Sequence, residues 1–399
     1  MEVVESGFKE TEIGLIPEDW EAVRLGEVGN YINGYAFKPS DWSNTGKPII
    51  RIQNLNNPSA SFNYFNGELD YKYLVKKGDI LISWSASLGA YLWNGEDAWL
   101  NQHIFKVELT NQNVAKDFLY FALLYYFVGQ ALANLHGSTM KHIVKSKFLN
   151  ILIPLPPLEE QKAIADILST VQNTIEKTEK VIDATKQLKK SMMKHLFTHG
   201  AVAVDEIDKV NLKESEIGLI PEHWEVVRLG DVMEGFMPNK KLKQSDYKAI
   251  GKFPVIDQGQ EYVAGFYDDE TMVFDKDLPV ILFGDHTRII KYVDFPFICG
   301  ADGLKIIIPK ENFHRKYFYY ALLNLNIPSR GYNRHFKILK EKLIPLPPLD
   351  EQQKIANILA TIDQKIQAEE KKKEALQNLF KTLLQQLMTG KIRVKKAKT

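Results

Sequence analysis

The sequence predicts a mixed α+β fold in which one plan of strands and helices is used twice. A proline-rich segment that leads into a long helical pattern lies at residues 153–200 and again at residues 344–390, with Gln161 aligned with Gln352 and Gly200 near Gly390. An opening motif at residues 10–28 returns at residues 214–232. Strand-like runs separated by turns dominate the regions between these repeats. Because internal repetition of this kind determines the architecture, we interpret the chain as two units of one plan.

The opening motif is the first repeated element. It reads Ile-Gly-Leu-Ile-Pro-Glu-x-Trp at residues 13–20 and again at residues 217–224, and Val-Arg-Leu-Gly follows in both copies. Trp20 and Trp224 are large, mainly apolar residues at the same place in each copy. We therefore interpret them as packing anchors at the start of each domain.

The variable regions, roughly 29–150 and 233–341, predict one mixed α/β fold with two different surfaces. Their strand-like runs are residues 78–84, 103–107, 278–284 and 304–309. An aromatic, helix-compatible segment closes each region, at residues 118–126 and 317–323. A scaffold that is kept while its surface changes is what two different targets would require.

Two long helical runs follow the proline-rich segments. Prolines cannot continue a helix and favour extended backbone before it, and the acidic residues that come next suit the positive end of a helix dipole. Apolar residues then recur at alternating steps of three and four, which indicates a narrow coiled-coil seam. The seam residues are Ile164, Leu168, Val171, Ile175, Ile182, Met192 and Leu196 in the first run, and Ile355, Leu359, Ile362, Ile366, Leu376, Phe380, Leu383 and Leu387 in the second.

Pairing between the two runs is the simplest way to bury both seams. Each run covers about 39 residues, which corresponds to roughly 58 Å of helix. Glu369 and Lys373 interrupt the second seam where Thr178 and Ile182 lie in the first, and polar residues at such positions fix register and pairing. The alternative is an ordinary helical hairpin within a large core, which the long sequence between the copies disfavours.

Length and composition bound the class of protein. A chain of 399 residues predicts two or more domains. Cys299 is the only cysteine, which excludes an internal disulfide and a cysteine-cluster zinc site and fits a reducing compartment. The acidic N-terminus is unlike a signal peptide, and the apolar run at residues 118–128 is too short to span a bilayer. We therefore expect a cytoplasmic protein without a membrane partner.

Several classes of catalytic motif are absent from the sequence. It contains neither GxGxxG for a dinucleotide nor a GxxxxGK[ST] phosphate loop. The Asn- or Asp-Pro-Pro-aromatic motif of adenine methylation is also missing, since Ser59 and Ala60 follow Asn57-Pro58. Glu160-Gln161-Lys162 matches a short fragment of nuclease sites, but it lies at a helix start without a partner aspartate. We therefore expect no catalytic residue, no cofactor and no metal site.

Local charge favours contact with nucleic acid, although the net charge of +1 does not. Residues 118–158 and 312–340 contain no acidic residue, carry several basic ones, and occupy equivalent places in the repeat. Each includes a loop, at residues 136–142 or 330–335, whose glycine, polar and basic residues suit phosphate clamping and base-edge contact. The alternative is a solvated basic face. The candidate DNA-binding residues here are Ser138, Thr139, Lys141, His142, Lys145, Arg330, Tyr332, Asn333, Arg334 and Lys337.

Other polar and basic residues are candidates with an open alternative. Asn101 and Gln102 are suited to reading base edges or to forming a turn. Lys240 and Lys241 would clamp phosphate or simply be solvated. We expect a disordered basic tail with weak attraction for phosphate at the C-terminus, formed by Lys391, Arg393, Lys395, Lys396 and Lys398.

The polar segment at residues 284–288 follows an apolar strand. Its Asp285 and His286 suggest catalysis, but neither a suitably placed nucleophile nor a metal cluster accompanies them. We therefore interpret His286, Thr287 and Arg288 as part of a DNA-facing loop.

The order of these motifs resembles the specificity subunit of Type I restriction–modification systems over nearly the whole chain. The residues that carry this resemblance are the paired opening motifs at 13–20 and 217–224 and the paired Ile-Pro-Leu-Pro-Pro-Leu-(Glu/Asp)-Glu-Gln hinges at 153–161 and 344–352. Further segments that look like those of target-recognition domains are residues 78–83, 100–107, 137–142, 284–287 and 300–303.

The resemblance implies two similar α/β target-recognition domains separated by two long antiparallel coiled-coil helices, as a pseudo-twofold internal repeat. Recognition domain 1 would comprise residues 1–152, and the first hinge and spacer helix residues 153–200. Recognition domain 2 would comprise residues 201–343, and the second hinge, spacer helix and basic tail residues 344–399.

The resemblance also implies the function. Each recognition domain would read one half of a bipartite, asymmetric site in double-stranded DNA, and the helices would dock two methyltransferase subunits, which restriction subunits join. Methylation and ATP-dependent cleavage would belong to those partners, so this chain would be non-catalytic. A helix of roughly 58 Å matches about 17 base pairs. The alternatives are a stand-alone DNA-modifying enzyme and a pure coiled-coil scaffold without DNA readout.

Overall fold

The computed structural model divides the chain into two compact units. Unit 1 comprises residues 1–179 and 372–399, and unit 2 comprises residues 180–371. The residues that the structure describes are 7–57, 59–129, 143–238, 240–329, 331 and 333–394. The division cuts both long helices, so that each unit contains one half of each helix. The boundaries predicted from the sequence instead treat each helix as a separate segment.

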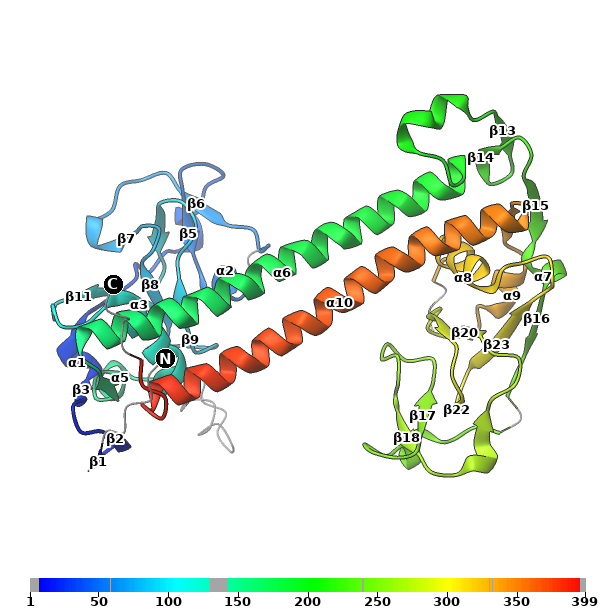
Figure 1. Ribbon diagram of the computed structural model, residues 1–399. Helices are drawn as coiled ribbons and strands as arrows, with labels where there is room; N and C mark the ends of the chain where they lie inside the picture. Colours follow the sequence, from blue (N-terminus) through cyan, green and yellow to red (C-terminus); the bar gives the residue numbers. More distant parts are fainter. Residues whose placement is uncertain are drawn as a thin grey trace. The chain divides into compact units, whose positions relative to one another are not determined.

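Unit 1 combines two four-stranded sheets with short helices (Figure 1, blue to cyan). The first sheet has the order β4-β11-β8-β9, with bounds Gly29–Asn33, Ile104–Leu109, Ile80–Ser83 and Gly89–Leu92. The second has the order β6-β5-β10-β7, with bounds Asn63–Phe65, Lys47–Ile50, Ala98–Leu100 and Leu74–Val75. Two-stranded pairs join β1 (Phe8–Thr11) to β2 (Gly14–Pro17) and β3 (Glu21–Arg24) to β12 (Leu152–Leu155). Its helices are α1 (Leu25–Val28), α2 (Ile52–Asn56), α3 (Lys116–Ala122), which continues as a π-helix over Leu123–Gly129, and α5 (Lys145–Leu149).

Unit 2 repeats this arrangement (Figure 1, green to orange). Its first sheet has the order β16-β23-β20-β21, with bounds Met233–Phe236, Leu304–Pro309, Val280–Gly284 and Ile290–Val293. Its second has the order β18-β17-β22-β19, with bounds Gly265–Tyr267, Phe253–Ile256, Phe297–Cys299 and Val273–Phe274. The pairs are β13 (Leu212–Ser215) with β14 (Gly218–Pro221) and β15 (Glu225–Arg228) with β24 (Leu343–Leu346). Its short helices are α7 (Leu229–Val232), α8 (Arg315–Leu323) and α9 (Phe336–Lys340).

The two units share one topology and one register. Strands β1 to β12 recur in the same sheet positions as β13 to β24. Ser83 pairs with Ile104 in unit 1, and Gly284 pairs with Leu304 at the equivalent place in unit 2. The predicted single α/β plan, used twice with different surfaces, is therefore confirmed.

The long helices are α6 (Leu158–His199) and α10 (Leu349–Met388). Within unit 1 the first half of α6 pairs antiparallel with the second half of α10, and Lys373 Nζ lies 2.8 Å from a Glu179 oxygen (Figure 1). Within unit 2 the remaining halves pair through Lys186 and Glu370 at 2.7 Å and through a second ion pair from α6 to α10. The predicted antiparallel pairing of the two runs is thus found inside each unit.

Eight of the fifteen predicted seam residues are buried, and the other seven are half-buried, namely Val171, Ile175, Met192, Ile362, Leu376, Phe380 and Leu383. Ile164, Leu168, Ile182, Leu196, Ile355, Leu359, Ile366 and Leu387 are all buried. The polar seam residue Glu369 is buried as well, with its Oε1 2.6 Å from Lys365 Nζ. Thr178 is also buried and donates to the carbonyl of Thr174 at 2.8 Å.

One glutamine at the start of each long helix joins that helix by hydrogen bonds to a loop of the same unit. Gln161 donates through Nε2 to the carbonyls of Pro156 and Asn113, both at 2.8 Å, and accepts from the N–H of Ala115 at 2.8 Å. Two of these bonds satisfy backbone groups just before α3, and the third satisfies a carbonyl just before α6. Gln352 makes the same three kinds of bond in unit 2.

The opening motifs confirm the predicted anchors. Trp20 and Trp224 are fully buried, each in the main core of its unit. Gly200 and Gly390 lie just after the ends of the long helices, and their φ angles of 80° and 67° suit glycine at a helix C-terminus. A β-carbon added at Gly200 would touch Trp224, and one added at Gly390 would touch Trp20. Each helix end therefore packs on an opening motif.

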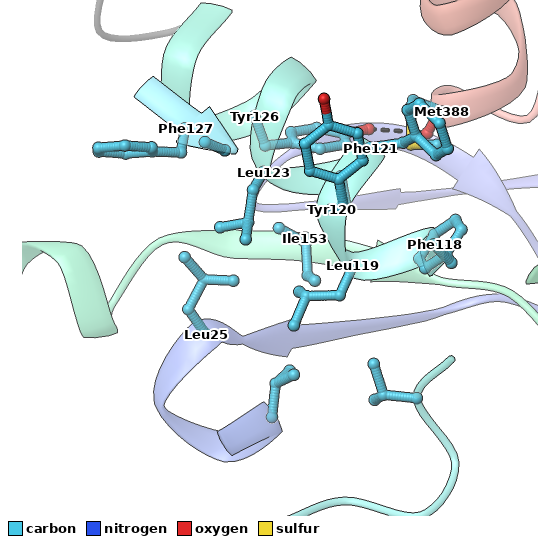
Figure 2. Close-up of a cluster of buried hydrophobic side chains, with 14 of the residues drawn as sticks. Leu25, Phe118, Leu119, Tyr120, Phe121, Leu123, Tyr126, Phe127, Ile153 and Met388 are labelled. Atoms are coloured by element: carbon cyan, nitrogen blue, oxygen red, sulfur yellow. Dashed lines mark hydrogen bonds between the residues drawn. The ribbon is translucent and has the colours of Figure 1, made fainter. Parts of the chain in front are cut away.

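The unit 1 core shows how the aromatic segment becomes buried. Phe118, Leu119 and Phe121 pack with Leu25 and Ile153 (Figure 2). Tyr126 donates to the carbonyl of Met388 at 2.9 Å, which fixes this segment to the end of α10 (Figure 2). The run at 118–128 is thus a buried helix, as predicted. In the described part of the chain, no helix is both long enough and apolar enough to cross a membrane.

The prediction of a disordered basic tail is wrong for Arg393. Its guanidinium group is largely buried and forms ion pairs with Glu160 and Asp19, each at 2.7 Å. A buried carboxylate on α6 requires a partner, and Arg393 supplies it. Lys391 is exposed, whereas Lys395, Lys396 and Lys398 lie outside the described residues.

Candidate nucleic-acid interface

Three loops meet at one end of the sheets in each unit, and we call them the loop cluster. In unit 1 they are residues 84–88, 101–103 and 143–144, and in unit 2 residues 285–289, 300–303 and 333–335. Backbone bonds join the loops in the same pattern. Trp84 donates to His103 and accepts from Ile143 in unit 1, at 3.2 and 3.0 Å. Asp285 donates to Gly303 and accepts from His335 in unit 2, both at 2.8 Å.

Asp285 holds the start of α9 in unit 2. Its buried Oδ1 accepts the N–H groups of His335 and Phe336, both at 2.8 Å. A carboxylate at this place stabilises the positive end of a helix. The carboxylate is therefore engaged with backbone, which fits the interpretation of Asp285 and His286 as part of a loop and not of a catalytic pair.

Gln258, at the end of β17, organises the loop that carries His286 and Thr287. Its Oε1 accepts from the N–H of His286 at 3.1 Å, and its Nε2 donates to the carbonyl of Asp302 at 2.6 Å. Thr287 Oγ1 donates to the Gln258 carbonyl at 2.7 Å. One amide thus connects two of the three loops.

Charge gathers around Asp302 in the same cluster. Lys241 Nζ lies 3.3 Å from Asp302 Oδ1, and the carboxylate is exposed. The hydrogen bond from Lys241 and the Gly303 N–H hold the pKa of Asp302 below its usual range, with a smaller contribution from the charge of Arg334. Lys241 and Arg334, both candidates from the sequence, therefore both act on the carboxylate of Asp302.

The unit 1 cluster has a different composition. Trp84 lies against His103, with ring centroids 4.9 Å apart, and stacks on Phe105 at 5.6 Å. Its Nε1 donates to Asn33 Oδ1 at 3.1 Å. Asn101 Oδ1 is buried without a hydrogen-bond partner among the described residues. Rings and amides therefore occupy the place that charged groups occupy in unit 2.

The remaining candidates differ in their contacts and in their exposure. Lys145 donates to the Tyr31 carbonyl at 2.9 Å and lies over the Phe105 ring. Arg288 donates to the Ile327 carbonyl at 2.8 Å, and Lys240 donates to Thr271 at 2.6 Å. The exposed candidates are Lys145, Lys240, Thr287, Asn333, Arg334 and Lys337. The half-buried candidates are Asn101, Gln102, Lys241, His286 and Arg288.

Six candidates lie outside the described residues: Ser138, Thr139, Lys141, His142, Arg330 and Tyr332. The described residues Ile143 and His335 hold equivalent places in the two clusters, because their N–H groups donate to Trp84 and Asp285. The contacts of all the candidate residues with DNA remain a prediction.

Sequence reasoning did not identify Gln258, Asp302 or Trp84 as cluster residues. Gln258 follows a strand that gave no motif, and it reaches the cluster only through sheet pairing. A signal was present for Asp302, which lies in the segment 300–303 that resembles recognition domains. Within the described residues, no group of His, Cys, Asp and Glu is arranged to hold a metal ion.

Comparison with known proteins settles the family. The family described as "Type I restriction modification DNA specificity domain" matches residues 17–187 and 221–378. The chain belongs to the Type I restriction–modification DNA specificity family. Its two matched segments fall on the two repeats, so each repeat is one specificity domain. The predicted family and fold class are confirmed.

Individual relatives agree with this assignment. The Type I restriction enzyme MjaVIII specificity subunit of Methanocaldococcus jannaschii is 32% identical over 422 residues, covering 98% of this chain and 97% of that protein. The EcoBI specificity subunit of Escherichia coli is 31% identical over 233 residues, covering 56% of this chain and 48% of that protein. The crystal structure of the S subunit from M. genitalium has a TM-score of 0.66 at 19% identity, covering 92% of this chain and 96% of that one.

The general role of this specificity family is DNA recognition and scaffolding of a multisubunit complex. Specificity subunits assemble with DNA and with modification and restriction subunits, and the family is in general non-catalytic. The chain is accordingly a Type I DNA specificity subunit.

Proposed function

We propose that this specificity subunit reads a bipartite, asymmetric site in double-stranded DNA, with one half-site for each loop cluster. The observation that carries the proposal is that equivalent loops meet at equivalent places in both units but present different groups. A common scaffold aims each cluster in the same way, whereas hydrogen-bonding and charged side chains determine which base edges are read.

We further propose that α6 and α10 dock two methyltransferase subunits, which restriction subunits then join. Exposed apolar side chains on the helices support a docking role, since such residues gain from being covered. They are Val181, Leu188 and Leu379. Methylation and ATP-dependent cleavage then reside in the partners, and the helix length sets the unread spacer between the half-sites.

Matched substitutions in the two loop clusters test whether each cluster reads one half-site. Arg334→Gln in unit 2 and Gln102→Ala in unit 1 should each relax base preference in one half of the methylated motif and leave the other half unchanged. Each lost base contact should cost about 1 to 3 kcal/mol of discrimination. Methylome sequencing of cells that express the subunit with its methyltransferase would report both half-sites at once.

The control is Lys337→Gln, because an exposed lysine on α9 would contact phosphate rather than bases. It should weaken binding similarly for all sequences and reduce the salt dependence. If Arg334→Gln and Gln102→Ala altered the same half-site, or neither, the assignment of one half-site to each cluster would be wrong.

A second experiment addresses the spacer. Insertion of one heptad into both α6 and α10 should lengthen the unread segment of the motif while leaving both half-sites intact. The sequence of methylated sites again provides the measurement. An unchanged spacer would show that the helices do not set it.

A further inference from the structure

The start of each long helix presents one glutamate to an equivalent site. Glu160 on α6 accepts from Trp20 Nε1 at 3.0 Å, and Glu351 on α10 accepts from Trp224 Nε1 at 2.9 Å. The tryptophans come from the repeated opening motifs. Because the framework is the same, the other partners of the two carboxylates can be compared directly.

In unit 1 an arginine fills the site. Arg393 donates through Nε to Glu160 Oε1 at 2.8 Å and through Nη2 to Oε2 at 2.7 Å, a two-pronged arrangement. Its guanidinium also contacts Asp19 at 2.7 Å and lies over the Trp20 ring at 5.5 Å. The N–H of Val394 donates to the same carboxylate at 3.2 Å. The chain's own C-terminal segment is thus the occupant.

In unit 2 the equivalent place is a cavity of about 640 Å³. In the described part of this unit, no arginine approaches Glu351. His223, which replaces Asp19 of unit 1, instead places its Nε2 2.6 Å from Glu351 Oε1. The His223 side chain is 54% exposed, so solvent already reaches one side of its ring.

The wall of this cavity suits a cation. It presents the carboxylates of Glu222, Asp350 and Glu351. Lys209 and Lys354 also line the cavity, but Lys209 pairs with Glu206 at 3.0 Å and Lys354 with Asp350 at 3.4 Å. His199 Nδ1 is buried there without a hydrogen-bond partner among the described residues, and a neutral ring nitrogen can accept an N–H. Several residues with acceptor atoms therefore line one space, and a guanidinium group needs several acceptors.

We propose that the cavity beside Glu351 binds an arginine side chain from another polypeptide, within a segment like the Lys-Ile-Arg-Val of residues 391–394. His223 leaves Glu351 as the guanidinium binds, and the arginine stacks beside Trp224 as Arg393 does beside Trp20. This site is separate from the loop clusters, and its occupant is a protein subunit. Nucleic acid is disfavoured because three carboxylates in the wall outnumber its two lysines, each of which is already paired with a carboxylate.

Calorimetric titration of the full-length chain with the peptide acetyl-Gly-Lys-Ile-Arg-Val-amide, which copies residues 390–394, tests the proposal. We expect binding to the wild type. His223→Asp recreates the Asp19 arrangement and should tighten binding about tenfold, since a further charge-assisted hydrogen bond is gained. Glu351→Gln should abolish binding, although its amide oxygen can still accept from Trp224.

Matched controls separate this site from its counterpart in unit 1. Glu222→Gln should weaken peptide binding, whereas the equivalent Glu18→Gln should leave it unchanged, and thermal melting verifies that each variant is folded. The peptide with glutamine in place of arginine should not bind. Equal binding of the two peptides, or binding that survives Glu351→Gln, would overturn the proposal. Inorganic phosphate binding that Lys354→Gln removes would instead reveal an anion site and overturn it as well.

Discussion

The loop cluster of unit 1 is built around rings and amides, whereas that of unit 2 is built around charged groups. Trp84 and His103 occupy in unit 1 the places that Asp285 and the Asp302 segment occupy in unit 2. The strands beneath the clusters keep the same order and register. The difference shows that the framework tolerates a complete change of chemistry at its tips, because the loops are joined through backbone atoms.

The largest effect should come from the anchors shared by both units. Trp20→Ala and Trp224→Ala each remove a fully buried indole and should destabilise their own unit by about 3 to 5 kcal/mol. Hydrogen exchange measured separately on β8 and β20 would show which unit opens. Equal opening of both strands in either variant would contradict the view that each anchor serves one unit.

The glutamine ties should give the next largest effect, and an equal one in the two units. Gln161→Ala and Gln352→Ala each leave three backbone groups without their partner, so we expect a loss of about 2 to 3 kcal/mol. Denaturant unfolding with exchange at the Ala115 and His314 amides provides the measurement.

Glutamate at the same positions is the control for this pair. A glutamate side chain can still accept the N–H of Ala115 or His314, but it cannot donate to the two carbonyls. Exchange at that N–H should therefore stay slow, while the free energy of unfolding still falls. A cost confined to one unit would show that the repeated bonds are not equivalent in strength.

A smaller effect should appear only in unit 2. Asp285→Ala leaves the N–H groups of His335 and Phe336 without their acceptor and should cost about 1 to 2 kcal/mol. Faster exchange at Phe336 would report it, and Asp285→Asn should recover part of the loss. Trp84→Ala at the equivalent place should leave the first turn of α5 unchanged, since no side-chain cap is present there.

Much of the framework follows from the sequence because its signals are local and occur twice. The apolar runs that became β8 and β20 are buried along their whole length and lie between turn residues. The heptad spacing of Leu168 and Leu359 required only the helical period and a partner. The glycines at 200 and 390 mark helix ends by their conformation alone.

The parts that the sequence did not reveal depend on contacts between distant residues. Arg393 reaches Glu160 across 233 positions of the chain, and nothing near either residue distinguishes this pair from a solvated charge. Gln258 enters the loop cluster through the parallel pairing of β17 with β22, a choice that composition does not specify. Site residues are therefore harder to predict than the elements that carry them.

The smallest predicted difference between the units concerns the start of α8 and its counterpart α3. His314 Nδ1 accepts from the N–H of Tyr317 at 3.3 Å, whereas Ala115 at the equivalent place provides no side-chain cap. Burial lowers the pKa of His314, and the charge of Lys316 lowers it further. The neutral ring is the form that can accept, so folding disfavours protonation.

The pKa of His314 is 6.5 in its ordinary state and lower in the folded protein. The stability that depends on the neutral ring is therefore fully present above pH 6.5, and it is lost as the pH falls through 6.5 toward the pKa of the folded state. Unit 2 should weaken between neutral and mildly acidic pH, by less than the roughly 1 kcal/mol of a helix cap. Exchange at the Tyr317 amide as a function of pH would measure it. His314→Ala should abolish the pH dependence and Ala115→His should introduce it in unit 1, because the two helix starts otherwise hold the same glutamine bond.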